Sequence, residues 1–245
     1  MTPPLPGTVD VSPDAAALAE RAAEWVAEAQ AAAIAGRGAF TIALAGGSTP
    51  EALYRRLASA PHRDRLDWSR WHVYFGDERA CPPDHPESNV RLARETLLDH
   101  VPIPPAQVHR MQAERPDLDA AAAEYSVLLE ATLPTGPAGA PRLDCILLGI
   151  GTDGHTASLF PGTPALDVVD AWATRGLATY APYDRITVTF PLINGGATVA
   201  FLVSGESKRA ALAGVVAGTV PAARVRPTHG DLRWFLDRAA TGADG

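Results

Sequence analysis

Cysteine and positive charge are both scarce in this chain of 245 residues. The two cysteines, Cys81 and Cys145, provide neither a disulfide framework nor the paired spacing of a zinc knuckle. Lys and Arg number 21 against 28 Asp and Glu, which gives a formal net charge of -7. This acidic balance argues against general affinity for nucleic acid or anionic membranes, although a local basic pocket could still bind a phosphate.

Long apolar runs and targeting signals are also missing. No run approaches the length of a membrane span, and the N-terminal "MTPPLPGTVD" lacks the basic start and apolar stretch of a signal peptide. We therefore expect a cytoplasmic protein with no membrane partner. Because the length suits one α/β domain and no linker or repeat divides the chain, we expect a single domain over residues 1–245.

Common signatures of hydrolytic enzymes are absent as well. The sequence contains no G-x-S-x-G nucleophile elbow and no H-E-x-x-H zinc motif. Neither cysteine has a recognisable catalytic partner, and the histidines show no metal-ligand spacing. What remains as the simplest hydrolytic scheme is a side chain that activates water without a metal.

Apolar strand patterns alternate with helical patterns along the chain. Strands are expected at 40–45, 71–75, 143–150, 185–190 and 198–205, and helices at 12–36, 50–57, 88–100, 117–133, 206–218 and 230–240. In the first helix, Ser12 is the expected N-cap and Gly36 the expected stop. Because the strands are apolar on both faces, they predict a doubly wound, mostly parallel sheet with helices on both faces, a three-layer α/β/α fold.

Four polar, glycine-bearing loops follow four of these strands. They are "GGSTP" (46–50), "GDER" (76–79), "GTDGH" (151–155) and "SGESK" (204–208). In open α/β sheets, ligands bind outside the carboxyl ends of the strands. Convergence of four such loops at one edge predicts a site, whereas a single one would indicate only a turn.

The first loop allows two interpretations. Ser48 and Glu51 have the spacing of a capping box, and Thr49 and the proline after it suit the start of a helix. Alternatively, backbone N–H groups and the hydroxyls of Ser48 and Thr49 hold a phosphate at the positive helix end. The adjacent Gly46 and Gly47 favour the phosphate, because a close anion requires them and a cap does not.

The second and fourth loops carry cations. Arg79 could donate two hydrogen bonds to a phosphate or carboxylate, and Asp77 could bind sugar hydroxyls or orient a catalytic group. The alternative for this loop is a solvated turn with an incidental ion pair. Lys208 stands on the expected first turn of a helix, where it opposes the dipole. Its position makes sense beside a bound phosphate; otherwise it is an exposed surface lysine.

The third loop resembles a dinucleotide-binding fingerprint, because Gly149, Gly151 and Gly154 have the spacing G-x-G-x-x-G. That motif needs a long helix directly after the glycines, but Pro161 and Pro164 break any helix here within a turn or two. The fingerprint is therefore a false positive, and no NAD site is expected.

The third loop instead brings Asp153 and His155 to the common edge. We expect a short helix, "TASLF", whose positive end disfavours imidazolium and keeps His155 neutral as a base. Asp153 could orient the ring or bind substrate. The alternative is a histidine that only caps this helix, but its place between glycine-rich turns favours a catalytic role. Whether Asp77 or Asp153 orients the base stays open.

Several motifs together resemble the 6-phosphogluconolactonase family. They include "LAGGSTPEALY", "WHVYFGDERACPPDHPESNVRLARETLL", "DCILLGIGTDGHTASLFPG", "RITVTFPLIN", "FLVSGESK" and "VRPTHGDLRWFLDRAA", in family order from about residue 15 to 240. The resemblance implies a doubly wound fold shared with glucosamine-6-phosphate deaminases. It also implies cofactor-free hydrolysis of 6-phospho-D-glucono-1,5-lactone to 6-phosphogluconate, in the oxidative pentose phosphate pathway. The partner would be a small sugar-phosphate lactone, and the protein a monomer or weak homodimer.

The same resemblance implies roles for single residues. His155 matches the general base, and Asp153 belongs to the same motif in a supporting role. The substrate-side matches are Gly46, Gly47, Ser48 and Thr49 in the phosphate-side loop, Arg79, Arg185 and Lys208 near the phosphate, and Asn89 near the site. Thr152 departs from the proline of many family members, with no evident effect on the chemistry.

Two rival functions are less well supported. A glucosamine-6-phosphate deaminase would share the fold, but it carries a different acidic motif in place of "FGDER" and lacks "HTASLFPG". A non-catalytic sugar-phosphate sensor would need a DNA-binding element, and the chain has neither a basic patch nor room for a helix-turn-helix domain.

Overall fold

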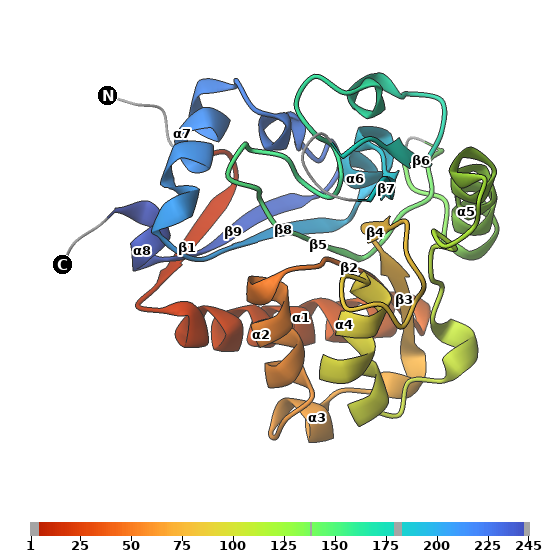
Figure 1. The fold of residues 1–245 in the computed structure, drawn as a ribbon. Coiled ribbons are helices and arrows are strands. Elements are labelled where there is room, and N and C mark those ends of the chain that lie inside the picture. Colours follow the sequence, from red (N-terminus) through yellow and green to blue (C-terminus); the bar gives the residue numbers. More distant parts are fainter. Residues whose placement is uncertain (1–4, 138, 179–182, 243–245) are drawn as a thin grey trace.

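A fully parallel, six-stranded sheet forms the centre of the protein (Figure 1). The computed structural model describes residues 5–137, 139–178 and 183–242. In chain order the strands of the large sheet are β1 (Thr8–Ser12), β2 (Phe40–Leu44), β3 (Trp71–Phe75), β5 (Cys145–Leu148), β8 (Thr198–Val203) and β9 (Asp231–Asp237). They are ordered β1-β9-β8-β5-β2-β3, and every neighbouring pair is parallel.

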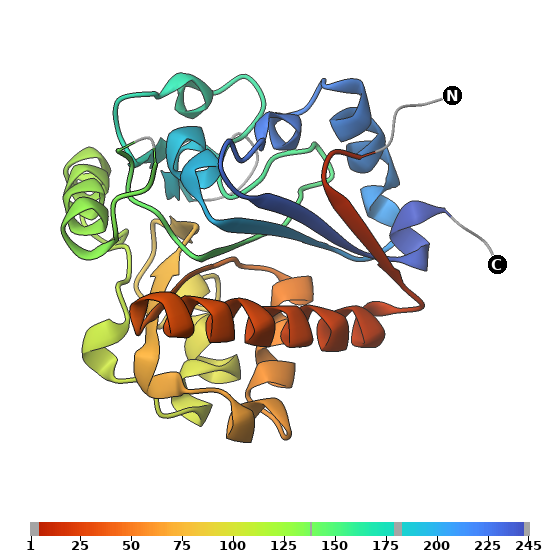
Figure 2. The same ribbon diagram turned by 180° about the vertical axis from the view of Figure 1, so that it is seen from behind.

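Helices cover both faces of this sheet, so the expected three-layer α/β/α fold is confirmed. The α-helices are α1 (Ala15–Arg37), α2 (Ser48–Leu57), α3 (His62–Arg65), α4 (Asn89–Thr96), α5 (Leu118–Thr132), α6 (Phe190–Gly195), α7 (Arg209–Ala217) and α8 (Arg238–Thr241). In Figures 1 and 2, α1, α2 and α4 lie on one side of the sheet, and α6 and α7 lie on the other. None of the helices in the described ranges is both long and apolar enough to cross a bilayer.

Alternate residues of the central strands pack into two separate hydrophobic cores, one on each face of the sheet. On β5, Cys145 and Leu147 belong to the core beneath α1 and α2, whereas Ile146 and Leu148 belong to the core beneath α5, α6 and α7. All four side chains are buried. This burial on both faces explains why the strand is apolar at every position instead of alternating with polar residues.

A second, antiparallel sheet stands beside the first. It consists of β4 (Asp77–Arg79), β7 (Arg185–Val188) and β6 (Ala173–Gly176), in the order β4-β7-β6. The expectation that "GDER" is a loop was therefore wrong for residues 77–79, because these residues pair with β7. The strand expected at 185–190 ends at Val188, and Phe190 already begins α6.

The start and end of the long first helix differ from the expectation. Ser12 is the last residue of β1, and the N-cap is Asp14, whose side chain accepts the N–H of Ala17 at 2.8 Å. The helix runs past Gly36 to Gly38, which has a left-handed φ of 77°. β1 itself was not predicted, because it is an edge strand whose valines, Val9 and Val11, are 41% and 48% exposed.

The last predicted helix, residues 230–240, was wrong over most of its length. Residues 231–237 form β9, and only Arg238–Thr241 are helical. Leu232, Trp234 and Leu236 enter one core while Phe235 enters the other. This alternation has the period of a strand, and a place between β1 and β8 buries both of its faces.

Candidate active site

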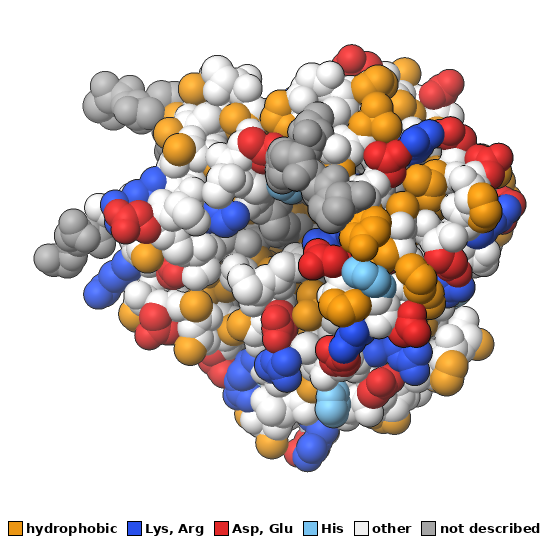
Figure 3. Space-filling model, viewed as in Figure 1, with side chains coloured by type: hydrophobic (Ala, Val, Ile, Leu, Met, Phe, Trp, Pro, Cys, Tyr) orange, Lys and Arg blue, Asp and Glu red, His pale blue; other side chains and the backbone are white. Residues whose placement is uncertain are grey.

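A pocket of about 300 Å³ opens where the strands β2, β3, β5 and β8 end. All four predicted loops contribute to it. Its lining residues are Ala45, Gly46, Gly47, Asp77, Arg79, Gly149, Ile150, Gly151, His155, Ala157, Ser158, Phe160, Arg185 and Lys208. Figure 3 shows this face of the molecule hollowed near its centre, with Lys and Arg side chains at the margin of the hollow. The volume lies at the lower end of the range typical of small-molecule sites.

Two arginines of the pocket stand directly opposite each other. Arg79 on β4 is the register partner of Arg185 on β7, so two like charges face each other across an antiparallel pair. Such a pair is destabilising unless something compensates it. Within the described ranges, neither guanidinium has a carboxylate within ion-pair distance; each instead donates to a backbone carbonyl, that of Glu87 or of Tyr183. The arrangement is suited to an anion.

The environment of Arg185 strengthens this conclusion. Arg185 is 7% exposed. Burial lowers the pKa of its guanidinium, and the charge of Arg79 acts in the same direction while Asp77 acts against it. Arg79 in turn keeps its Nε buried without a hydrogen-bond acceptor in the described part of the chain. Charged groups held in this way at a pocket wall are typical of ligand-binding positions.

Lys208 adds a third positive charge to the same pocket. It ends the 3-10 turn Glu206–Lys208, and α7 begins one residue later, so the lysine precedes the helix instead of standing on its first turn. No carboxylate of the described residues forms an ion pair with it. The turn starts at Gly205, whose φ of 96° is left-handed.

Asp153 and His155, which both belong to the third loop, are in close contact. Oδ1 of Asp153 lies 2.6 Å from Nδ1 of His155 and accepts the backbone N–H of the same residue at 3.1 Å. Partial burial acts to raise the pKa of Asp153, but these hydrogen bonds hold it below its ordinary value. A charged carboxylate at Nδ1 favours the tautomer with the hydrogen on Nδ1, which leaves Nε2 as the basic nitrogen.

The helix expected after His155 is absent. Thr156 and Leu159 instead form an isolated bridge around a turn in which Ala157 has a φ of 46°. The expectation that a helix N-terminus lies beside His155 was therefore wrong. A left-handed conformation costs an L residue roughly 1–2 kcal/mol, and such strain is concentrated at functional sites.

The ring of His155 is positioned by its neighbours. The ring of Phe160 packs against it at a centroid distance of 4.4 Å. On another side the ring lies so close to the backbone that a Cβ on Gly151 would stand 2.1 Å from Nδ1. The second glycine of the apparent dinucleotide fingerprint therefore makes room for the histidine. Phe160 had not been singled out from the sequence, and only its place in "HTASLFPG" could have indicated it.

Asp77 has different partners from Asp153. It is 8% exposed; Oδ1 accepts Nδ2 of Asn89 at 2.9 Å, and Oδ2 accepts Oγ of Ser158. Asn89 itself does not line the pocket but lies beneath the first loop, where a Cβ on Gly46 would stand 2.0 Å from its Oδ1. Asn89 and Ser158 thus fix the carboxylate of Asp77 in the pocket wall.

Glu78 organises the same region and was missed by the sequence analysis. Its buried carboxylate accepts the backbone N–H groups of Arg79, Asn89 and Val90 and the hydroxyl of Ser88. Burial raises the pKa of Glu78, while these hydrogen bonds act to lower it. A carboxylate at the start of α4 satisfies N–H groups that have no partner within the helix.

The first loop meets the pocket through its glycines. Gly46 and Gly47 line it, whereas Ser48 and Thr49 form the first turn of α2 outside the lining. The predicted capping box is wrong: Gly47 is the N-cap, no side chain caps the helix, and Glu51 pairs with Arg55. The N–H groups of this first turn have no partner within the helix and can serve an anion.

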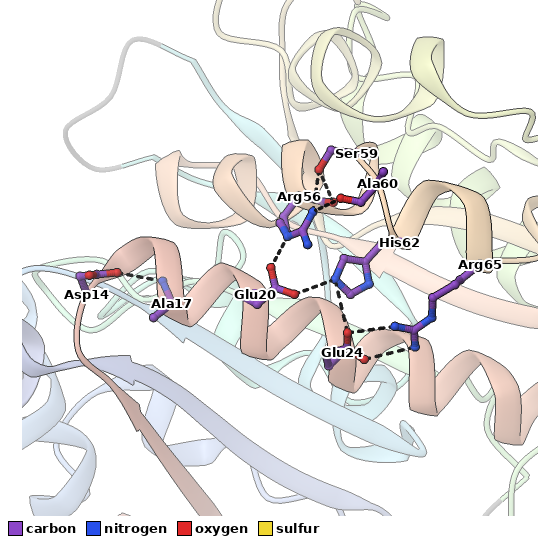
Figure 4. Close-up of polar contacts among 9 residues, drawn as sticks. All are labelled: Asp14, Ala17, Glu20, Glu24, Arg56, Ser59, Ala60, His62 and Arg65. Atoms are coloured by element: carbon purple, nitrogen blue, oxygen red, sulfur yellow. Dashed lines mark hydrogen bonds and ion pairs between the residues drawn. The ribbon is translucent and has the colours of Figure 1, made fainter.

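One group in the described part of the chain has the ligand types of a metal site, and it lies elsewhere. Glu20, Glu24 and His62 each offer a ligand atom within 4.8 Å of the others. Figure 4 shows that Arg56 and Arg65 already pair with the two carboxylates. The charges are thereby balanced, and the cluster joins α1 to α2 and α3 as a structural contact.

Comparisons with known proteins agree with this architecture. A family model described as Glucosamine-6-phosphate isomerases/6-phosphogluconolactonase matches residues 13–234. A 6-phosphogluconolactonase of Nostoc is 43% identical over 238 residues, covering 95% of this chain and 96% of the relative. One of Synechocystis is 44% identical over 237 residues, with the same two coverages of 95% and 96%. The solved 6-phosphogluconolactonase of Trypanosoma brucei has a TM-score of 0.86 and 29% identity, covering 99% of this chain and 100% of that one.

The fold and the pocket together define a class of protein. This is a three-layer α/β/α protein with a pocket lined by two arginines and a lysine at the carboxyl edge of its parallel sheet, beside a paired histidine and aspartate. The chain belongs to the family of glucosamine-6-phosphate isomerases and 6-phosphogluconolactonases.

Proposed function

We propose that this chain hydrolyses 6-phospho-D-glucono-1,5-lactone to 6-phospho-D-gluconate. The relatives at 43% and 44% identity over nearly the whole chain are named for this activity. The observation that carries the proposal for the site is the register pair Arg79–Arg185, which lines one pocket together with Lys208 and His155. Three cations without an acidic partner in the described ranges suit a phosphate, and a base beside them suits an adjacent ester.

In this proposal the phosphate end of the substrate is held by charge and by backbone. Arg79 and Lys208 donate to the phosphate oxygens, and Arg185 adds its charge from the neighbouring strand. Gly46 and Gly47 allow close approach to the N-terminus of α2, where unpartnered N–H groups favour an anion. Ser48 and Thr49 remain predicted contributors from the first turn of that helix.

His155 then acts as the general base. Its Nε2 takes a proton from a water molecule while the water oxygen forms a bond to C1 of the lactone. The bond between C1 and the ring oxygen breaks, and the protonated histidine returns the proton to that oxygen. The product acid ionises. Asp153 accepts the Nδ1 hydrogen throughout, so it orients the ring and stabilises the imidazolium that forms.

Negative charge develops on the carbonyl oxygen during attack. We assign its stabilisation to backbone N–H groups of the glycine-rich loops, which lie in the pocket wall. Asp77, held by Asn89 and Ser158, is placed to accept hydrogen bonds from sugar hydroxyls. None of these steps requires a metal or an organic cofactor. We further propose that the protein is a single domain, lies in the cytoplasm, is a monomer or weak homodimer and binds no nucleic acid.

A direct assay separates this function from its rivals. Each turnover releases one acid, so purified protein with freshly prepared 6-phosphogluconolactone should accelerate proton release well above the spontaneous rate. Glucosamine 6-phosphate should yield no ammonia. Ammonia release would favour a deaminase, and binding of the lactone without acceleration would favour a sensor; either outcome would overturn the proposal.

A further inference from the structure

We infer that Asp237, at the end of β9, is a positioning residue that holds Lys208 at the phosphate end of the pocket. This inference rests on the proposed function, because it assigns Lys208 to the substrate phosphate. Asp237 does not line the pocket, and it acts through the turn that carries the lysine. It lies outside the four polar loops, in the C-terminal motif "VRPTHGDLRWFLDRAA", to which the sequence assigned no role at the site.

Asp237 reaches across from one strand end to the next. The register of β8 and β9 pairs Val203 with Leu236, so the next residues along, Ser204 and Asp237, are neighbours at the carboxyl edge. The carboxylate accepts the hydroxyl of Ser204 and the N–H of Gly205, at 3.1 and 3.2 Å for its two oxygens. It also accepts the N–H of Ala240 at 2.8 Å.

The carboxylate is suited to a permanent role at this place. Asp237 is 4% exposed. Burial acts to raise its pKa, but the hydrogen bonds from Ser204, Gly205 and Ala240 hold that pKa below its ordinary value. The side chain is therefore a charged acceptor of several donors, and a neutral amide could not replace it without turning one acceptor into a donor.

The turn beyond Gly205 transmits this constraint to Lys208. The N–H of Lys208 donates to the carbonyl of Gly205 at 3.1 Å. The next residue, Arg209, donates from Nε to the carbonyl of Ala239 and pairs with Glu206. The turn is thus hydrogen-bonded at Gly205 to the end of β9 and at Arg209 to the segment that follows it, while Lys208 lines the pocket.

The decisive variant is Asp237→Asn. We expect KM for the phosphorylated lactone to rise about tenfold while kcat stays within about twofold, because a charge-assisted contact to the phosphate is weakened and the His155 pair is untouched. The KM for unphosphorylated D-glucono-1,5-lactone should not change. Inorganic phosphate should inhibit the variant about tenfold less well. Asp231→Asn, at the exposed other end of β9, is the matched control and should behave as the unmodified protein.

A double-mutant cycle tests the route through the lysine. In a Lys208→Ala background, adding Asp237→Asn should change KM less than about twofold, because the contact that Asp237 positions is already gone. If Asp237→Asn does not fold, Ser204→Ala removes a single donor and should raise KM in the same direction by a smaller factor.

Three results would overturn the inference. One is an unchanged KM for the phosphorylated lactone in folded Asp237→Asn and in Ser204→Ala. Another is an equal loss for phosphorylated and unphosphorylated lactones. The third is a full, multiplicative effect of Asp237→Asn in the Lys208→Ala background. If the unmodified protein does not hydrolyse the lactone, the proposed function fails, and calorimetric binding of inorganic phosphate to the same variants decides the role of Asp237 by itself.

Discussion

Replacing His155 by alanine is expected to lower kcat about 10²- to 10⁴-fold, the usual contribution of a positioned general base. KM for the lactone should change less than about threefold, because the contacts assigned to the phosphate stay in place. The loss would thus fall equally on kcat and kcat/KM, as expected for an interaction made in the transition state. Steady-state proton release from fresh lactone, corrected for spontaneous opening, measures both constants.

His229→Ala is the matched control for this variant. His229 is exposed and outside the pocket. The hydrogen bond described for it is accepted by its backbone carbonyl, from Arg142, and does not involve the imidazole. We expect it to keep full activity. Turnover of the His155 variant within about tenfold of the unmodified protein, in a folded sample, would contradict the assignment of the base.

Replacing Arg79 by alanine is expected to raise KM for the phosphorylated lactone about 10- to 100-fold, since a hydrogen bond to a charged group contributes about 1.5–3 kcal/mol. Turnover of unphosphorylated lactone should be nearly unaffected. The thermal midpoint should change little, because loss of the hydrogen bond to the Glu87 carbonyl is offset by relief of the repulsion from Arg185. Weaker substrate binding with unchanged thermal stability would indicate that Arg79 serves the ligand and not the fold.

Arg91→Ala provides the comparison for the arginine. Arg91 lies on α4, pairs with Glu95 and does not line the pocket. Its removal should leave KM unchanged for either lactone. Assignment of Arg79 to the phosphate would be contradicted if Arg79→Ala raised KM equally for phosphorylated and unphosphorylated lactones, or if it left both unchanged.

The sequence predicted the strands that are buried on both faces and bounded by glycine. The strand expected at 71–75 is β3, Trp71–Phe75, and that at 40–45 is β2, Phe40–Leu44. The strands it missed are short, polar or at an edge. β6, with the sequence ATRG, offers almost no apolar pattern, and β4 is a strand only because β7 pairs with it. Pairing of this kind depends on partners far along the chain.

The candidate site was also predictable in part. The carboxyl edge of a parallel sheet brings loops together whatever their separation in sequence, so glycine-bearing loops could be assigned to one pocket. The sequence could not reveal that Arg79 faces Arg185, because that depends on an antiparallel register. Nor could it decide which aspartate contacts the histidine. In the structure the Asp153 carboxylate is hydrogen-bonded to His155, whereas the Asp77 carboxylate is hydrogen-bonded to Asn89 and Ser158.

A structure of the complex with 6-phosphogluconate would show whether the arginine pair and Lys208 hold the phosphate while His155 faces C1. We expect phosphate oxygens within hydrogen-bond distance, about 2.7–3.2 Å, of Arg79 and Lys208, with the C1 carboxylate beside Nε2 of His155. A reversed ligand, with its carboxylate at the arginine pair, would contradict this expectation. So would a phosphate bound outside the pocket.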